Sequence, residues 1–225
     1  NPHAERGVPR CGHARSVCLM AKQSPWVFVT DRTDVHAERF HRLFQELSPS
    51  SERLDIVFDS AGNPLATRNG SSLSSWSDIR ESLGDAGLVI SGPLDTVSRH
   101  IAQGDFRHVG ISWATDLMVG AGSSHQLASQ IEDAVASMDV VVTDNHAAEN
   151  ALVAMGVAPE RIVRVPWGPE PAEALESTTA GSGLRKRLGV PADSHIILYP
   201  RALEPLYDPL VFVEAFSGLV RDYPS

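Results

Sequence analysis

The stretch WVFVT at residues 26–30, followed by LDIVF at residues 54–58, decides the fold of this chain. Short apolar runs of this kind are typical of strands that are buried on both faces of a parallel sheet. Between the two runs, Asp34 is placed to cap a helix. Apolar side chains recur along that helix at helical spacing, at Phe40, Leu43, Phe44 and Leu47. The order of strand, helix and strand predicts a βαβ unit.

The same alternation continues along the chain. Further strands are expected at residues 87–91, 109–113, 140–143 and 161–165, with helices between them. Residues 60–75 are rich in Ser, Asn and Gly and are expected to form a connection. We therefore predict an α/β fold, a doubly wound parallel Rossmann-like sheet that covers residues 25–166.

The segments on either side of this domain differ from it in composition. Residues 1–24 have no clear period and are expected to be a poorly ordered leader, and residues 167–183 are rich in Pro, Gly and Ser and are expected to be a linker. A strand at residues 195–198 and an amphipathic helix at 208–220 follow. We expect residues 184–225 to be the incomplete start of a second Rossmann-like domain.

The composition excludes several classes of protein. The net charge is −9, from 19 basic and 28 acidic residues, which disfavours nucleic-acid binding because that needs a basic face. The two cysteines, Cys11 and Cys18, are not spaced as a metal site or a disulfide framework, so we expect no metal and a reduced, cytoplasmic setting. No signal peptide and no transmembrane run is evident.

Three polar residues are candidates for function because of their positions. Asp116 follows a strand, where a carboxylate can orient or deprotonate a hydroxyl or can instead cap the next segment. His146 begins the helix after the fifth strand, where a capping or exposed role is as reasonable as a functional one. Arg201, at the end of the expected strand and before a helix that starts at residues 208–209, suits an anion such as phosphate. An ion pair between Arg201 and Glu204 is the alternative.

Several passages together resemble a known family. They are DVVVTDNH at residues 139–146, MGVAPERIVRVPWG at residues 155–168 and RALEPLYDP at residues 201–209. In this order they are similar to passages of the family-four glycosyltransferases, retaining enzymes with two Rossmann-like domains in the GT-B arrangement. The resemblance runs from about residue 26 to residue 225.

The resemblance implies transfer of a sugar from a nucleotide-diphosphate donor with retention of configuration, and without a metal or cofactor. It implies that Arg201 meets the donor diphosphate and that the loops at Gly92 and at residues 112–116 face the acceptor. Asp116, at a strand end in the second of these loops, is our catalytic candidate. The acceptor would be a sugar, a lipid-linked molecule or another small molecule, and contact with the inner membrane surface is left open. Cleft residues would include Gly92, Trp113, Thr115, Asn145 and His146. Because the cleft has to close over both substrates, Trp167 and Gly168 are expected at the hinge.

The chain departs from the family pattern in three places. No lysine follows Arg201, the glycine-rich loop after the first strand is replaced by Asp31-Arg-Thr-Asp34, and a pair of glutamates seven residues apart would lie beyond Ser225. We therefore expect a fragment with little activity alone. The alternatives are a nucleotide-sugar 2-epimerase of the same fold and a non-catalytic Rossmann-like binding module.

Overall fold

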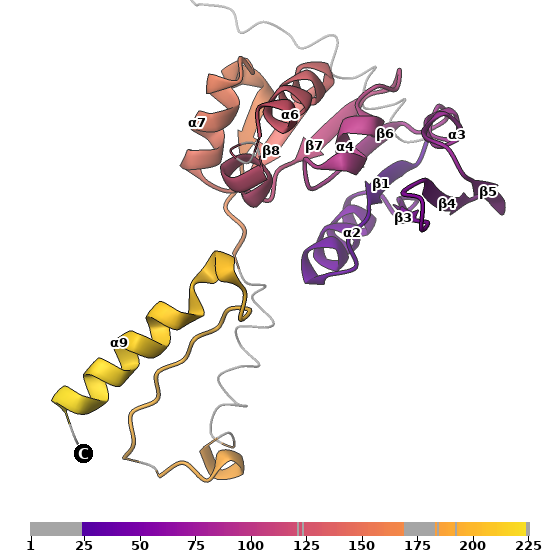
Figure 1. The fold of residues 1–225 in the computed structure, drawn as a ribbon. Helices are drawn as coiled ribbons and strands as arrows, with labels where there is room; N and C mark the ends of the chain where they lie inside the picture. The colour runs from indigo at the N-terminus through magenta and orange to yellow at the C-terminus, as the bar shows by residue number, and fades with distance from the viewer. Residues whose placement is uncertain are drawn as a thin grey trace, which may run out of the picture. The chain divides into compact units, whose positions relative to one another are not determined.

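The computed structural model describes residues 24–120, 122, 124–168, 183, 185–191 and 193–223. The chain divides into two compact units, Asn1–Trp167 and Gly168–Ser225, and each is described by itself (Figure 1). The expected leader, apart from Ser24, and residues 169–182 of the expected linker lie outside the described residues. The division falls within the expected linker. That the first domain holds the acceptor and the second the donor stays a prediction.

A six-stranded parallel sheet forms the centre of the first unit. Its strands run in the order β2-β1-β6-β7-β8-β9, and every neighbouring pair is parallel. The strands are β1 (Trp26–Thr30), β2 (Glu52–Asp55), β6 (Leu88–Ser91), β7 (His108–Ile111), β8 (Val140–Thr143) and β9 (Ile162–Arg164). The prediction of an α/β fold with a parallel Rossmann-like sheet is confirmed.

Helices cover both faces of this sheet (Figure 1). They are α2 (Val35–Leu47) on one side, and α3 (Trp76–Ser82), α4 (Thr96–Ile101), α6 (His125–Ser137) and α7 (His146–Ala154) on the other. Successive residues of a strand point to opposite faces. Accordingly, Phe28 of β1 packs with Phe44 of α2, whereas its neighbour Val29 packs with Val97 of α4.

The order of the strands contains one reversal of direction. From β1 the chain crosses to β2 at one edge, and it then returns over β1 to β6 and proceeds to the other edge. The point of reversal lies between β1 and β6. In open parallel sheets, ligands bind outside the carboxyl ends of the strands at such a point. The topology therefore directs attention to the loops that follow β1 and β6.

One expected strand is divided, and one expected connection is folded. The run at residues 54–58 splits after Asp55, and β3 (Val57–Phe58) leaves the main sheet. It pairs with β4 (Pro64–Arg68), which pairs with β5 (Ser71–Leu73), in a separate antiparallel sheet. Asn69 and Gly70, with φ of 51° and 77°, make the two-residue turn between β4 and β5. Asn-Gly favours this turn because both positions need positive φ.

The second unit contains a long helix, α9 (Pro209–Asp222), preceded by a short 3-10 turn, Pro205–Tyr207. The helix expected at residues 208–220 is confirmed. The strand expected at residues 195–198 is wrong, because residues 194–200 pair with no strand of either sheet. A strand needs a hydrogen-bonded neighbour, and the described part of this unit contains none.

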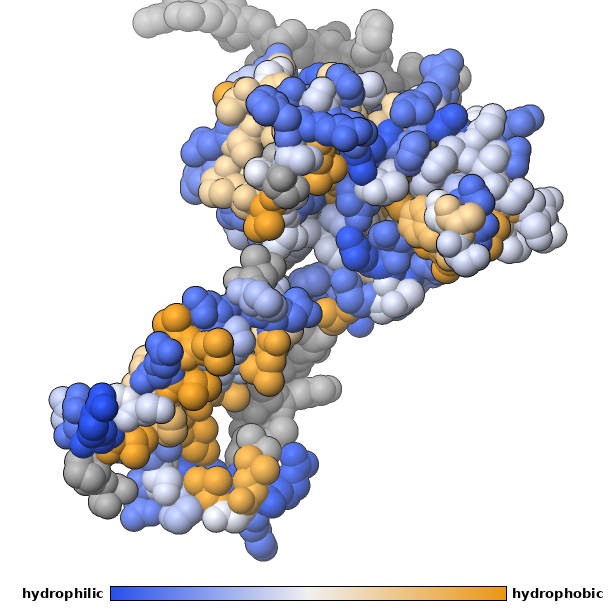
Figure 2. All heavy atoms as spheres, in the orientation of Figure 1, coloured by the Kyte–Doolittle hydropathy of each residue, from blue (hydrophilic) through white to orange (hydrophobic). Residues whose placement is uncertain are grey.

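The apolar side of α9 is exposed within the second unit. No residue of the helix is buried, and Figure 2 shows hydrophobic side chains along it. The large exposed side chains include Leu210, Val211, Val213, Phe216 and Val220. Within the described residues of this unit, the Phe212 ring of α9 packs on the Tyr199 ring at 4.9 Å, while the rest of its apolar side stays exposed.

Candidate functional site

The loops that follow β1 and β6 are joined by two hydrogen bonds at the reversal point. The buried hydroxyl of Thr30 donates to the carbonyl oxygen of Gly92 over 2.9 Å. The Arg32 guanidinium donates to a carboxylate oxygen of Asp95 over 2.8 Å. The polar groups of the two loops are thus held together at the carboxyl edge of the sheet.

Asp31 and Asp95 make this point electrostatically unusual. Burial of the Asp95 side chain, and then the negative charge of Asp31, raise the pKa of Asp95 to about 6, although Arg32 acts in the opposite direction. One oxygen of Asp31 is buried and has no hydrogen-bond donor among the described residues, although it lies 3.3 Å from Arg32 Nε. A carboxyl with a raised pKa beside a sheet's carboxyl edge is a recognised mark of a functional site.

The carboxylate of Asp116 fastens the loop after β6 to the loop after β7. It accepts hydrogen bonds from the backbone N–H groups of Leu94 (2.7 Å), Trp113 (3.2 Å) and Leu117 (2.9 Å), and from the hydroxyl of Ser112 (2.7 Å). Each carboxylate oxygen therefore accepts two donors, which uses most of its capacity. This geometry makes Asp116 a positioning residue, and the catalytic role expected from the sequence stays a prediction.

The loop between Trp113 and Asp116 is strained. Ala114 has φ of 63°, which is unfavourable for a residue with a Cβ, and the N–H of Thr115 donates to the carbonyl of Trp113 in a γ-turn of 2.8 Å. A five-residue π-helical turn, Asp116–Gly120, follows directly. Strained turns and π-helical turns occur often at functional sites. The side chain of Thr115 is exposed there.

An aromatic shelf borders the same edge. It consists of His36 and Phe40 of α2 with Trp113 and Trp167. The His36 ring lies 5.6 Å from the Trp113 ring and 6.0 Å from the Trp167 ring, and Phe40 contacts both indoles, at 6.4 and 5.1 Å. His36 is exposed and the other three rings are partly exposed.

Gly92 is required by close packing beside this shelf. A Cβ at this position would lie 2.8 Å from the carbonyl oxygen of Ile111 and 3.5 Å from the Trp113 indole nitrogen. The indole nitrogen is itself buried without a hydrogen-bond partner among the described residues. Gly92 and Trp113, both expected in the cleft, are therefore neighbours, and Asp116 holds the backbone of Trp113.

Asn145 and His146 lie at the next strand end. Asn145 caps α7, because its side-chain oxygen accepts from Ala148 N (2.9 Å), and its amide donates to Asp144 (2.7 Å). The His146 ring is largely exposed and lies 3.1 Å from Glu149, which also pairs with Arg164. In the structure, Asn145 therefore caps a helix and His146 pairs with Glu149 at the surface. Their contact with an acceptor stays a prediction.

Trp167 and Gly168 stand on either side of the boundary between the two units. The Trp167 ring packs edge-on against Phe40 and so is anchored in the first unit. Any pivot would accordingly begin after Trp167. Their role as a hinge stays a prediction.

Arg201 lies in the second unit, beside the start of α9. Its guanidinium lies 5.2 Å from the centre of the Tyr207 ring, and Tyr207 is two residues before the helix. No ion pair joins Arg201 to Glu204, although both residues are described. Asp208 gives α9 no side-chain cap, so the first N–H groups of this helix have no side-chain acceptor from that residue. The strand expected before Arg201 is absent, but an exposed cation beside a helix N-terminus is present.

Sequence reasoning missed the contact between Arg32 and Asp95 and the aromatic shelf. The sequence pattern assigns residues 31–34 a helix cap at Asp34 and a departure from the family's glycine-rich loop, but it gives Arg32 no role. Both contacts depend on which strands are neighbours, and the sequence alone does not give that order.

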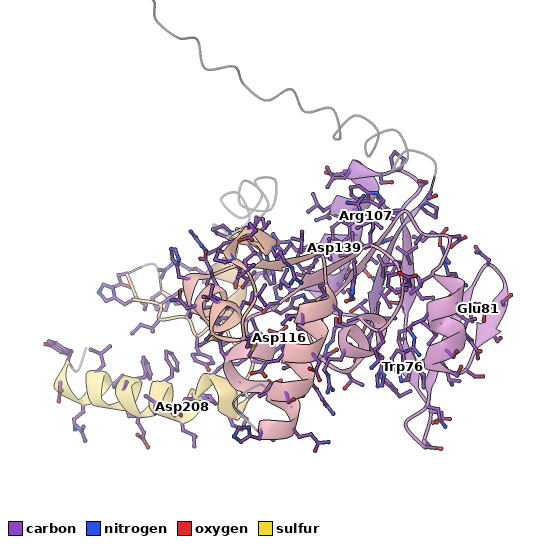
Figure 3. The ribbon with its side chains drawn as sticks, turned by 90° about the horizontal axis from the view of Figure 1, so that it is seen from above. Trp76, Glu81, Arg107, Asp116, Asp139 and Asp208 are labelled. Carbon is purple, nitrogen blue, oxygen red and sulfur yellow. The ribbon has the colours of Figure 1, made fainter. Side chains whose placement is uncertain are left out.

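Other features of the surface lie away from this edge. A hollow of about 220 Å³ lies between α4 and α6, lined by Arg99, His100, Gln103, Gln130, Asp133 and others. Its Arg99 is already bonded to Gln130 and Thr96, and its other charged residue, Asp133, is an exposed surface carboxylate. We therefore place the candidate site at the strand ends. Figure 3 shows Asp116 well apart from Trp76 of α3.

The described residues offer neither a metal-binding cluster nor a membrane-spanning helix. They contain no group of three or more His, Cys, Asp or Glu side chains arranged to hold a metal ion. They also contain no helix that is both long and apolar enough to cross a membrane.

Comparison with known proteins gives a partial match to glycosyltransferases. The chain is 34% identical over 94 residues to the D-inositol 3-phosphate glycosyltransferase of Acidothermus cellulolyticus, covering 41% of this chain and 20% of that protein. It is 31% identical over 94 residues to the enzyme of the same name from Kineococcus radiotolerans, covering 41% and 21%. No family model matches the chain. The matched stretch spans about a fifth of the length of these relatives, and it supports a relationship to glycosyltransferases.

Proposed function

We propose that this protein takes part in glycosyl transfer, in which a sugar passes from a nucleotide-diphosphate donor to a hydroxyl-bearing acceptor with retention of configuration. The observation that carries the proposal is the similarity to two glycosyltransferases in a chain with a parallel Rossmann-like sheet. The names of those relatives include D-inositol 3-phosphate, which describes their activity. The donor and the acceptor of this protein are left open by the comparison.

In this proposal the first unit holds the acceptor at the carboxyl edge of its sheet. The loops after β1, β6 and β7 are held in place by the Thr30–Gly92 bond and by the Asp116 carboxylate, which gives a preorganised surface. Fixed geometry of this kind lowers the entropic cost of placing an acceptor hydroxyl.

The second unit supplies positive charge for the donor. The leaving group is a nucleoside diphosphate, so transfer is assisted by cations and helix N–H groups that stabilise the developing negative charge. Arg201 and the uncapped start of α9 have this character. The proposal needs no metal and no bound cofactor, and the nucleotide sugar is a co-substrate.

Binding of the donor phosphates tests this role of Arg201. The 225-residue chain is titrated into UDP-glucose and GDP-mannose while the phosphorus resonances are followed by NMR. We expect the diphosphate resonances to broaden, and we expect Arg201→Ala to weaken the effect about tenfold or more, since a charge-assisted bidentate contact is lost.

A matched control is Arg221→Ala, which removes an exposed arginine from the last turn of α9. It should leave the titration unchanged. If neither sugar nucleotide affects the wild-type chain, or if both variants behave alike, the assignment of Arg201 is wrong. Incubation with donor and acceptor, followed by NMR of the anomeric carbon, tests transfer itself, and an inverted product would contradict retention.

A further inference from the structure

The aromatic shelf (His36, Phe40, Trp113, Trp167) is placed to contact a ligand as well as to cover the core. Its inner side packs against the cluster that contains Phe28 and Ile111. Its outer side is partly open, and His36 is exposed between the two indoles. Aromatic faces carry partial negative charge, so they attract the weakly positive C–H groups on the face of a sugar or cyclitol ring.

The strand-end segments beside this shelf carry more carboxylates than cations. The strand-end segments 30–36, 91–96, 112–117 and 143–146 contain five aspartates, namely Asp31, Asp34, Asp95, Asp116 and Asp144, and a single arginine, Arg32. Arg32 is engaged by Asp31 and Asp95. The edge therefore has an excess of negative charge, which repels a phosphate group and accepts hydrogen bonds from hydroxyl groups.

The shelf and the carboxylates are adjacent in space. His36 follows the loop of Asp31 in the same chain segment, and it contacts Trp113. Trp113 lies against Gly92, three residues before Asp95. The Asp31 side chain is 20% exposed, and its buried oxygen has no hydrogen-bond donor among the described residues. Sites for small molecules combine apolar and aromatic surface with a few polar groups that orient the ligand, and both kinds of group are present at this edge.

We propose that this edge binds an uncharged, hydroxyl-bearing ring, which stacks on Trp113 and Trp167 while Asp31 and Asp95 accept hydrogen bonds from its hydroxyl groups, and that it rejects a phosphomonoester. The inference rests on the proposed function, because it gives the chemical class of the acceptor for that same site. It differs from the proposed function in that it requires binding by the first unit only.

NMR of the four indole N–H groups tests the proposal on the whole chain. Each resonance is assigned by replacing one tryptophan with phenylalanine, and the probes are myo-inositol, methyl α-glucopyranoside and inorganic phosphate. We expect both neutral rings to shift the resonances of Trp113 and Trp167. We expect Trp26 and Trp76 to be unaffected and phosphate to shift none of the four.

Two variants separate binding from folding. His36→Ala removes an exposed ring and should weaken the response to the neutral rings about threefold to tenfold, as expected for one aromatic contact, without loss of structure. Trp76→Phe is the matched control, because Trp76 stacks on His100 elsewhere in the unit, and it should leave the response unchanged.

The outcomes distinguish this inference from the proposed function. If the shelf serves only as core packing, neither ring will shift Trp113 or Trp167, and the inference is overturned. A response to phosphate at these indoles overturns it as well. If the rings bind while sugar nucleotides fail to affect the phosphorus resonances, the ring site stands and the proposed donor role fails.

Discussion

The carboxylate of Asp116 accepts a hydrogen bond of 2.7 Å from the backbone N–H of Leu94, which is 22 residues earlier in the chain. This bond ties the loop after β6 to the loop after β7. The same carboxylate also accepts from Trp113 and Leu117, so it organises the strained turn at Ala114. The local geometry of the candidate site thus depends on one acidic side chain.

Replacement of Asp116 by Ala should destabilise the first unit by about 2–3 kcal/mol, because partly buried backbone donors lose their acceptor. Asp116→Asn should reduce the free energy of unfolding by less than Asp116→Ala does, since the asparagine oxygen can still accept from the N–H of Leu94. Urea unfolding followed by circular dichroism measures both. The exposed Asp105→Ala is the control and should change stability by no more than about 0.5 kcal/mol. An Asp116→Ala variant as stable as the wild type would contradict the positioning role.

Local sequence patterns predicted much of the main sheet. Apolar runs predicted β1 and β8 at their observed bounds, and Asp34 caps its helix as expected, because capping depends only on residues two or three positions away. The Asn69-Gly70 turn was also readable from the sequence and was overlooked, so β4 and β5 were missed.

The candidate site was only partly predictable, because its contacts join residues distant in sequence. Arg32 and Asp95 meet because β1 and β6 are neighbours, and that adjacency is a property of the whole sheet. The strand expected before Arg201 failed for a related reason. Strand conformation depends on a partner as well as on apolar residues, and none is present in the described part of that unit.

Stability should fall in acid because of His108. This side chain is buried in β7, where its Nε2 lies 2.8 Å from the Ser91 hydroxyl, and burial lowers its pKa from 6.5 to about 4. The unfolded chain therefore binds a proton that the folded chain does not bind between these values. The stabilisation that neutral His108 gives to the folded state is fully present above pH 6.5. As the pH falls towards 4, the free energy of unfolding decreases by roughly 3 kcal/mol on this account.

Urea unfolding at a series of pH values measures this effect, and His108→Asn should flatten the acid side of the profile even though it lowers stability overall. The control is His125→Asn, which makes the same substitution at the exposed start of α6 and should leave the shape of the pH profile unchanged. A profile for His108→Asn that stays parallel to the wild type would show that His108 is not responsible.

Asp95 should have the opposite dependence on pH. Its folded pKa of about 6 lies above the ordinary 3.8, so the folded state binds a proton more readily between these values. The contribution of Asp95 therefore favours folding in acid and becomes unfavourable as the pH rises through about 6. In Asp95→Asn the amide oxygen can still cap α4 by accepting from Val97 N.

Relative to Asp95→Asn, the wild type should lose up to roughly 3 kcal/mol between about pH 4 and pH 7. The Arg32 pair exists only while Asp95 is ionised, and its loss is a small term, because the Arg32 side chain is 46% exposed. Unfolding free energies of the two proteins at each pH test this expectation. A difference that does not vary with pH would contradict it.

Gly92→Ala should disturb the site even though the change is a single methyl group. The added Cβ would lie 2.8 Å from the carbonyl oxygen of Ile111, and a backbone atom in a buried sheet has little room to move. We expect a loss of about 1–3 kcal/mol in stability. We also expect a shift of the Trp113 indole resonance, because the indole nitrogen would lie 3.5 Å from the added Cβ. In the matched control, Gly122→Ala, nothing lies within 4 Å of the added Cβ. This variant should leave both stability and the Trp113 resonance nearly unchanged. If Gly92→Ala left the Trp113 resonance in place, the loop after β6 would be free to yield, and the preorganised edge that the acceptor proposal requires would be wrong.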